Sequence, residues 1–249
     1  MKSWAGWLKR RLRGPLLPAP PIQVRHAEHS MLFSADDEPA QPDDYLLDLA
    51  ALAIARARVL DLDEVAQRMK TPPYYPQIWP GEHYQLLTAI VQELAPTVSI
   101  EVGTYTGLSA LSMFSHLPPN SHLVTFDVTP WRTFEDIVLT DAEFANGRLK
   151  QEITNLGDRV TFDKYAEVLR SADLIFLDGP KDGVFEQQFL DHLSNLQLVK
   201  QPILVFDDIR VWNMLRIWRE ISRLKLDPTS FGHWSGTGLV HRVDRGWCT

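Results

Sequence analysis

The sequence predicts an α/β protein in which helices cover both faces of a doubly wound, mostly parallel sheet. Short runs rich in β-branched and aromatic residues alternate with longer amphipathic segments over most of the 249 residues, a pattern typical of such sheets. The β-branched run Val98–Val102 leads directly into two glycines, Gly103 and Gly107. Apolar periodicity then changes from strand-like to helix-like, which predicts a strand, a tight turn and a helix.

The N-terminal part of the chain is expected to lie outside this sheet. Residues 1–43 have a basic start and a proline-rich stretch, which predicts a tail and a linker. Residues 44–80 carry a helical pattern over 45–69 that prolines end, and they are expected to form a helical cap. The domain that contains the sheet is expected to span residues 81–249, beginning with a helix over 82–94.

Six more strands are predicted after the first one. Four are short runs separated by longer segments, and two near the C-terminus are expected to form an antiparallel hairpin around Gly236 and Gly238. The expected strands cover residues 123–127, 159–163, 173–178 and 203–208, and the hairpin lies within 226–243. The connections are predicted to be mostly helical over residues 131–156, 185–198 and 212–224. The sequence therefore predicts a seven-stranded sheet.

Composition excludes several classes of protein. The net charge is −7 although the first fourteen residues are basic, so the remaining chain is strongly acidic. An acidic body argues against broad nucleic-acid binding, which requires a basic surface. The single cysteine, Cys248, excludes an intramolecular disulfide and a multi-cysteine metal site. No apolar run is long enough for a membrane span, and the start lacks a signal-peptide core, so we expect a cytoplasmic protein.

The basic segment 1–14 has two interpretations. Its apolar residues Trp4, Trp7, Leu8 and Leu12 recur at helical spacing. Such a segment could lie on an anionic membrane surface or bind a partner. A frayed basic tail is the simpler interpretation, and it is the one that we expect.

The glycine turn after the first strand predicts a ligand site. Glycines let backbone N–H groups approach a ligand closely, and the helix N-terminus adds partial positive charge. The spacing between Gly103 and Gly107 matches neither the dinucleotide fingerprint nor a phosphate-binding loop. Glu101 lies inside the motif, which suits a cationic or hydroxyl-rich ligand better than a pyrophosphate. A tight turn without a ligand is the alternative.

Acidic residues end three of the predicted strands: Asp127, Asp178 and the pair Asp207 and Asp208. Ligands of open α/β sheets bind beyond the carboxyl ends of the strands, so these side chains are expected to converge. Asp127 follows the glycine turn by about twenty residues, the usual distance for an acid that binds ribose hydroxyls. The other three acids would repel one another unless they were protonated or bound a cation such as Mg²⁺, Mn²⁺ or Ca²⁺. Solvated loop acids are the alternative.

These motifs resemble class I S-adenosylmethionine-dependent methyltransferases over residues 81–243, and most closely the cation-dependent O-methyltransferases of the catechol and caffeoyl-CoA type. Segment 101–109, Glu-Val-Gly-Thr-Tyr-Thr-Gly-Leu-Ser, is similar to their glycine motif. Segment 176–182, Phe-Leu-Asp-Gly-Pro-Lys-Asp, is similar to their Phe-Leu/Val-Asp-x-x-Lys-Asp motif. Val-Phe-Asp-Asp at 205–208 lies at their Ala-Asp-Asn metal segment. The family usually has asparagine in place of Asp208, although related bacterial sugar and macrolide O-methyltransferases have an Asp-Asp pair.

The resemblance implies a Rossmann-like fold and a role for each matched residue. It implies a divalent cation held by Asp178, Asp207 and Asp208, with Lys181 as the general base. A lysine beside a cation is expected to have a lowered pKa, which helps it act as a base. Without Asp178 three residues earlier, Lys181 would be interpreted as a solvated surface lysine. The residues implied in binding S-adenosylmethionine are Glu101, Gly103, Tyr105, Gly107, Ser109, Asp127 and Asp178.

The sequence thus predicts an O-methyltransferase that uses S-adenosylmethionine and a divalent cation, Mg²⁺ first and Mn²⁺ or Ca²⁺ as alternatives. The expected acceptor is a hydroxyl of a small metabolite, such as a sugar, a natural product or a diol. One alternative is a metal-independent methyltransferase in which Asp207 and Asp208 orient the acceptor. Another is a non-catalytic donor-binding scaffold recruited through the basic N-terminus. The acceptor and the oligomeric state, including a homodimer, stay open.

Several aromatic and histidine residues carry weaker signals. His233 is expected to be structural, because no second metal ligand has a matching spacing. Trp131 could stack on adenine, although packing within a helical insertion is the commoner role. Tyr74, Tyr75 and Trp79 either shape the acceptor entrance, as the resemblance implies, or pack against the N-terminal helices.

Overall fold

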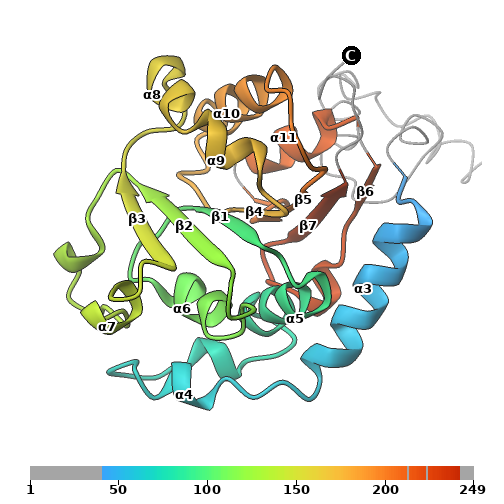
Figure 1. The fold of residues 1–249 in the computed structure, drawn as a ribbon. Coiled ribbons are helices and arrows are strands. Elements are labelled where there is room, and N and C mark those ends of the chain that lie inside the picture. Colours follow the sequence, from blue (N-terminus) through green and yellow to red (C-terminus); the bar gives the residue numbers. More distant parts are fainter. Residues whose placement is uncertain (1–40, 212, 223, 242–249) are drawn as a thin grey trace, which may run out of the picture. The chain divides into compact units, whose positions relative to one another are not determined.

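A computed structural model describes residues 41–211, 213–222 and 224–241 of the chain (Figure 1). Within these residues, seven strands form one sheet in the order β3-β2-β1-β4-β5-β7-β6. Neighbouring strands from β3 to β5 run parallel, whereas β7 runs antiparallel to both β5 and β6. The predicted fold, a Rossmann-like, mostly parallel sheet with an antiparallel C-terminal hairpin, is confirmed. The basic segment 1–14 lies outside the described residues.

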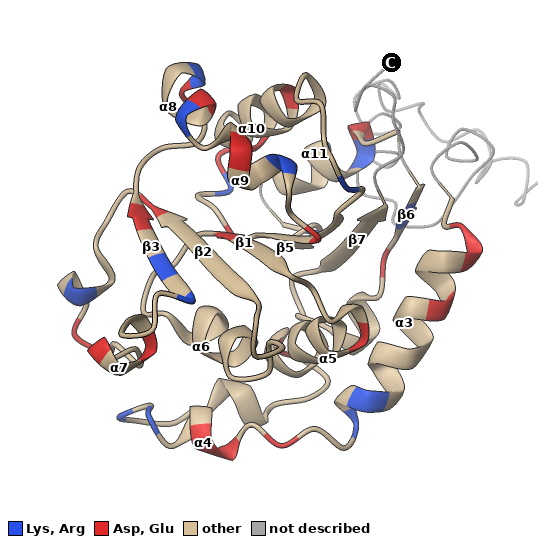
Figure 2. Cartoon of the chain, viewed as in Figure 1, with Lys and Arg blue, Asp and Glu red and all other residues tan. Residues whose placement is uncertain are grey.

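Apolar strands form the middle of the sheet. The strands are β1 (Val98–Val102), β2 (His122–Asp127), β3 (Leu149–Ile153), β4 (Leu174–Leu177), β5 (Ile203–Asp207), β6 (Leu224–Leu226) and β7 (Thr237–His241). Strands β4 and β5 are buried along their whole length, as expected for strands with helices on both faces. Charged residues lie mainly on the surrounding helices and loops (Figure 2).

Helices cover the two faces of the sheet, with α5 and α6 on one face and α9, α10 and α11 on the other (Figure 1). The helices are α3 (Asp44–Ala57), α4 (Asp63–Ala66), α5 (Tyr84–Leu94), α6 (Leu108–Phe114), α7 (Asp141–Phe144), α8 (Arg159–Lys164), α9 (Ala166–Arg170), α10 (Phe185–Ser194) and α11 (Met214–Glu220). Short 3₁₀ turns lie at Tyr75–Gln77, Trp131–Thr133 and Thr229–Phe231. Among the described residues, no helix is long and apolar enough to cross a membrane.

The helical pattern over 45–69 forms two helices, α3 and α4, with a break between them. Asp43 caps α3 by accepting a hydrogen bond from the backbone N–H of Leu46 at 2.9 Å. The buried face of α3 packs on α5, and Leu46 belongs to the same apolar core as Leu239 of β7. Helix α3 therefore shares the apolar core of the sheet domain. The division of the chain at residue 80 stays a prediction.

One predicted strand is wrong. Residues 159–163 form α8, because Asp158 accepts hydrogen bonds from the backbone N–H and the hydroxyl of Thr161 and so caps a helix. The third parallel strand is instead β3, inside the segment 131–156 that the sequence predicts as mostly helical. Its sequence, Leu-Lys-Gln-Glu-Ile, favours a helix locally, but pairing with β2 at the sheet edge overrides that preference.

The C-terminal strands also differ in detail from the prediction. Strand β6 begins at the last residue of the segment 212–224 that was predicted as helical, and a long connection with a 3₁₀ turn separates it from β7. Gly238 lies inside β7 rather than in a turn. A Cβ atom at Gly238 would lie 2.5 Å from the ring of Trp218, so this glycine allows α11 to pack closely on the sheet.

The strand register brings the predicted site residues into one row. Pairing aligns the final apolar residues of β2, β1, β4 and β5 with one another. The residues that follow these aligned positions are Gly103, Asp127, Asp178 and Asp207. The convergence expected from parallel strands is therefore built into the sheet.

Candidate active site

Two cavities meet at the carboxyl ends of the parallel strands. The larger has a volume of about 330 Å³, and Asp127 is among its lining residues. The smaller has a volume of about 250 Å³, and Ser109 and Lys181 are among its lining residues. The residues that line both are Gly103, Tyr105 and Asp178. The glycine turn therefore separates a larger cavity from a smaller one that contains a lysine and a carboxylate.

The glycine turn is shaped by a close approach to β4. Gly103 has φ +100°, and a Cβ atom there would lie 2.0 Å from the carbonyl oxygen of Asp178. Gly107, the residue before α6, has φ +86°, and its Cβ would collide with Leu139. Both positions therefore require glycine for a physical reason. Tyr105 also has positive φ, and its exposed ring packs edge-on against Phe134.

Asp127 fixes this turn from β2. Its Oδ2 accepts hydrogen bonds from the backbone N–H groups of Thr104 and Tyr105, both at 2.9 Å. Its Oδ1 accepts a bond from the N–H of Thr129 at 2.9 Å. Each carboxylate oxygen can accept more than one hydrogen bond. Asp127 is thus held rigidly in the wall of the larger cavity, with acceptor capacity left for a ligand.

Glu101 lies under the turn rather than in a cavity wall. It is fully buried, and its oxygens accept hydrogen bonds from Ser109 Oγ at 2.6 Å and Thr125 Oγ1 at 2.5 Å. Burial raises the pKa of Glu101 to about 8, although the two hydrogen bonds oppose that shift. In this structure Glu101 connects β1, β2 and α6, and its predicted contact with a donor stays a prediction.

This buried acid gives a pH prediction. Between a typical unfolded pKa of about 4.3 and the folded pKa of about 8, the folded state holds the extra proton, so stability falls as pH rises. Glu101→Gln is expected to remove that part of the decrease, on the order of 2–4 kcal/mol between pH 5 and 8.5. Urea unfolding at both pH values measures it, with the exposed Glu167→Gln as control. An equal pH dependence in wild type and Glu101→Gln would contradict the prediction.

Three carboxylates gather beside the smaller cavity. Oxygens of Asp178, Asp207 and Asp208 lie within 4.8 Å of one another. Burial and the charge of Asp207 raise the pKa of Asp178 to about 6. Asp208 has φ +60°, an uncommon backbone conformation for a residue with a side chain, which functional sites often contain. The structure therefore brings together the three acids that the sequence predicts as metal ligands.

Lys181 lies among these carboxylates. Its ammonium forms an ion pair with Asp178 and lies 3.1 Å from Oδ2 of Asp208. Burial alone would lower the pKa of Lys181, but the charges of Asp178, Asp207 and Asp208 outweigh burial and raise it. The sequence analysis expects a lowered pKa for Lys181. That lowering would require a cation to neutralise part of the negative charge of the three carboxylates.

Glu186 holds the loop that presents Lys181. This buried carboxylate accepts hydrogen bonds from the backbone N–H groups of Lys181 and Gly183, both at 2.8 Å. Lys181 itself has φ +58°, so the loop needs such support. Sequence analysis missed Glu186, because a glutamate in the first turn of an amphipathic helix carries no distinguishing signal.

Two histidines surround Asp207. Nδ1 of His233 lies 2.9 Å from Oδ1 of Asp207, and Nδ1 of His83 lies 3.5 Å from the same oxygen. Burial alone would raise the pKa of Asp207, yet His83 and His233 together hold it well below its usual value. The same contacts raise the pKa of both histidines against the effect of burial. Sequence analysis missed His83 and expected His233 to be structural, since the residues that meet here are far apart in the chain.

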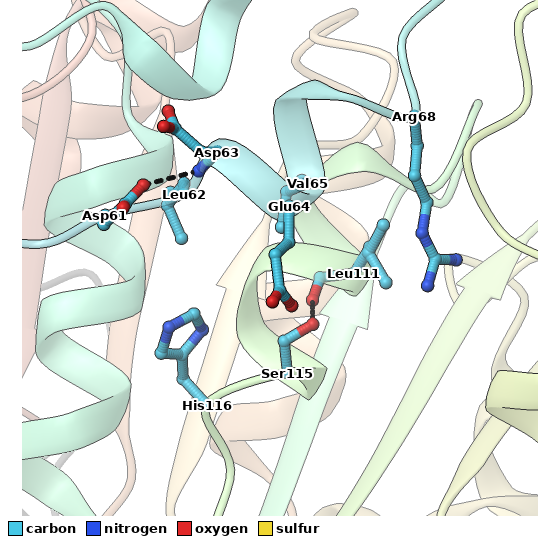
Figure 3. A pocket seen from close by; sticks show the side chains of 9 residues that line it. All are labelled: Asp61, Leu62, Asp63, Glu64, Val65, Arg68, Leu111, Ser115 and His116. Atoms are coloured by element: carbon cyan, nitrogen blue, oxygen red, sulfur yellow. Dashed lines mark hydrogen bonds between the residues drawn. The ribbon is translucent and has the colours of Figure 1, made fainter.

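Two other features lie away from this chemistry. Trp131 is buried and stacks on Phe144 at 5.4 Å, so it packs within the domain. A further cavity, of about 280 Å³, lies between α4 and α6 (Figure 3). Its lining residues are Asp61, Leu62, Asp63, Glu64, Val65, Arg68, Leu111, Ser115 and His116. None of the predicted site residues is among them.

Known proteins resemble the part of the chain that forms the site. Residues 100–209 match a family described as "Methyltransferase domain". Catechol O-methyltransferase of Mus musculus is 29% identical over 130 residues, which cover 51% of this chain and 48% of that protein. Catechol O-methyltransferase of Sus scrofa is 27% identical over 125 residues, which cover 50% of this chain and 67% of that protein. The chain therefore spans about half the length of the mouse relative that it matches.

Among solved structures, a methyltransferase from Geobacter sulfurreducens has a TM-score of 0.45 and 15% identity, covering 89% of this chain and 96% of that chain. The family match includes the glycine turn, Asp127 and all three clustered carboxylates. Residues 100–209 thus resemble a methyltransferase domain, and the resemblance to class I S-adenosylmethionine-dependent methyltransferases that the sequence predicts is confirmed.

Proposed function

We propose that this protein transfers the methyl group of S-adenosylmethionine to a hydroxyl of a small molecule, with a divalent cation held by Asp178, Asp207 and Asp208. The observation that carries the proposal is the shared wall of the two cavities, formed by Gly103, Tyr105 and Asp178. A donor in the larger cavity would direct its reactive end toward the smaller cavity. Methyl transfer is an in-line displacement, so such positioning supplies much of the acceleration.

The glycine turn and Asp127 suit the donor. The turn offers close backbone approach, and Asp127 lies in the cavity wall with acceptor capacity for ribose hydroxyls. Ser109 lines the smaller cavity, where its hydroxyl oxygen can accept a hydrogen bond from the amino-acid end of the donor while its O–H donates to Glu101. Glu101 would then act by positioning Ser109.

The carboxylate cluster fits a divalent cation. Its three acids provide hard oxygen ligands, and the ammonium of Lys181 already contacts two of them, so the cluster stabilises positive charge. A bound divalent cation would supply Lewis acidity that lowers the pKa of the acceptor hydroxyl. An acceptor with two neighbouring oxygens, such as a vicinal diol, suits this arrangement because three carboxylates leave other ligand positions open.

Lys181 is the proposed general base. Lys181 lines the smaller cavity, next to the carboxylate cluster. An acceptor bound in that cavity would therefore lie close to its Nζ. It can take the hydroxyl proton only when neutral, and the surrounding carboxylates favour its charged form. Activity is therefore expected to rise with pH until the ammonium has lost its proton.

A metal-independent transferase of the same fold is the second candidate. One observation favours it: Lys181 pairs with Asp178 and Asp208, and His233 pairs with Asp207, so each acid has a cationic partner or hydrogen-bond donor within the protein. In that case the acids would orient the acceptor. Incubation of pooled hydroxylated acceptors with labelled donor, with and without a chelator, tests both candidates. Labelling of no acceptor in either condition would contradict transferase activity.

Donor binding gives a separate prediction. Asp127→Asn is expected to weaken the affinity for S-adenosylmethionine by about 10–100-fold, because a charge-assisted hydrogen bond contributes roughly 1.5–3 kcal/mol. Titration calorimetry measures the affinity, and the exposed Asp163→Asn is the matched control. An unchanged affinity in a folded Asp127→Asn protein would remove Asp127 from the donor site.

A further inference from the structure

We propose that His83, His233 and Asp207 form a second metal position, beside the carboxylate cluster, for a divalent transition ion such as Zn²⁺, Fe²⁺ or Co²⁺. Ligand atoms of these three residues lie within 4.8 Å of one another. Imidazole suits such ions, whereas the carboxylate cluster suits Mg²⁺, Mn²⁺ or Ca²⁺. The two positions share Asp207 and differ in the ion that they select.

His83 is the first argument, because its imidazole is buried without a hydrogen-bond partner. Its side chain is 5% exposed. Within the described part of the chain, neither ring nitrogen has a hydrogen-bond partner. The aromatic rings of Tyr84 and Phe176 pack against it, with ring centroids 4.2 and 5.3 Å from the centroid of the imidazole. Burying unpaired polar nitrogens is costly, and a metal ion facing Asp207 would give one of them a partner.

His233 is the second argument, because both of its ring nitrogens face carboxylates. Nδ1 lies 2.9 Å from Oδ1 of Asp207, and Nε2 lies 3.6 Å from Oε2 of Glu82. A histidine that binds a metal through one nitrogen usually donates its other N–H to a carboxylate. Glu82 is mostly buried and placed for that role.

Distances between the ligand atoms fit a tetrahedral ion. Metal–ligand distances of about 2.0–2.2 Å place neighbouring ligand atoms about 3.4 Å apart. The separation between Nδ1 of His83 and Oδ1 of Asp207 is 3.5 Å. The separation between Nδ1 of His233 and the same oxygen is 2.9 Å. These two atoms would have to move slightly apart to bind the same tetrahedral ion.

The proposal does not depend on methyl transfer, and metal binding tests it directly. The full chain is stripped of metal and titrated with Co²⁺, whose visible absorption strengthens when imidazoles bind it in a site of low coordination number. We expect strong absorption in the wild type that excess Mg²⁺ does not remove. His83→Asn and His233→Asn should each lose it, with affinity about 100-fold weaker, and Glu82→Gln should weaken affinity by about 10–100-fold.

Controls separate this position from other sites. A double variant of two other histidines, His26→Asn with His29→Asn, should leave the spectrum unchanged. Because His83→Asn could fail to fold, a second readout keeps His83 and His233 in place. The double variant that lacks His26 and His29 is loaded with Cu²⁺ and measured by pulsed electron paramagnetic resonance. Nitrogen coupling there supports the proposal. No nitrogen coupling, or an unchanged Co²⁺ spectrum in folded His233→Asn, overturns it and leaves the proposed Mg²⁺ position and the transferase activity untouched.

Discussion

Lys181→Met is expected to lower turnover by about 10²–10⁴-fold, the usual effect of losing a general base. Lys181 contacts Asp178 and Asp208 at the smaller cavity, and no nearby residue of the described chain repeats that geometry. Methionine keeps the length of the side chain while removing the proton acceptor. Donor affinity should change little, and metal affinity should be kept or increased, because the ammonium no longer competes for the carboxylates.

The pH profile separates a base from a structural lysine. The carboxylates around Lys181 raise its pKa, so wild-type turnover should increase with pH as the lysine loses its proton, and Lys181→Met should lack this increase. Lys200→Met is a matched control, since Lys200 also pairs with an aspartate, Asp173, at 2.7 Å but outside the site. Wild-type turnover in folded Lys181→Met would rule out the base role.

The sequence predicts the parallel sheet well because most residues of its central strands are buried. Strands β1, β4 and β5 read as short runs rich in apolar residues, and an acid or a glycine follows each of them. The prediction fails at β3, a sheet edge whose polar sequence needs only one partner strand. It fails again at residues 159–163, where one capping residue, Asp158, decides in favour of a helix.

The residues of the candidate site likewise fall into those that the sequence predicts and those that only the folded structure reveals. Asp127, Asp178, Asp207 and Lys181 were predicted because each follows a recognisable strand or lies in a motif. His83, Glu186 and the contact of His233 with Asp207 depend on how α5, α10 and the final loop pack on the sheet. No local pattern encodes those contacts, so only the folded chain reveals them. The donor contact of Glu101 stays a prediction, and its hydrogen bonds from Ser109 and Thr125 depend on how β1, β2 and α6 pack together.

Removal of the divalent cation is expected to abolish turnover, and Mg²⁺ or Mn²⁺ should restore it. Lewis-acid stabilisation is worth several kcal/mol, which corresponds to about 10³-fold or more in rate. Asp207→Asn should behave like the chelated enzyme, because Asp207 is the most buried of the three carboxylates. It should also destabilise the fold by about 3–5 kcal/mol, since His233 loses its buried ionic partner and the negative charge 3.5 Å from His83 is removed.

Turnover and unfolding must therefore be measured on the same samples. Asp208→Asn is the matched variant, since it keeps an oxygen ligand and the family that the sequence resembles usually has asparagine there. It should retain a larger share of activity than Asp207→Asn and respond to the same ions. Metal analysis first establishes that chelation has removed the bound ion. Full turnover by that metal-free protein would defeat the cation mechanism, and the acids around Lys181 would then act by orienting the acceptor.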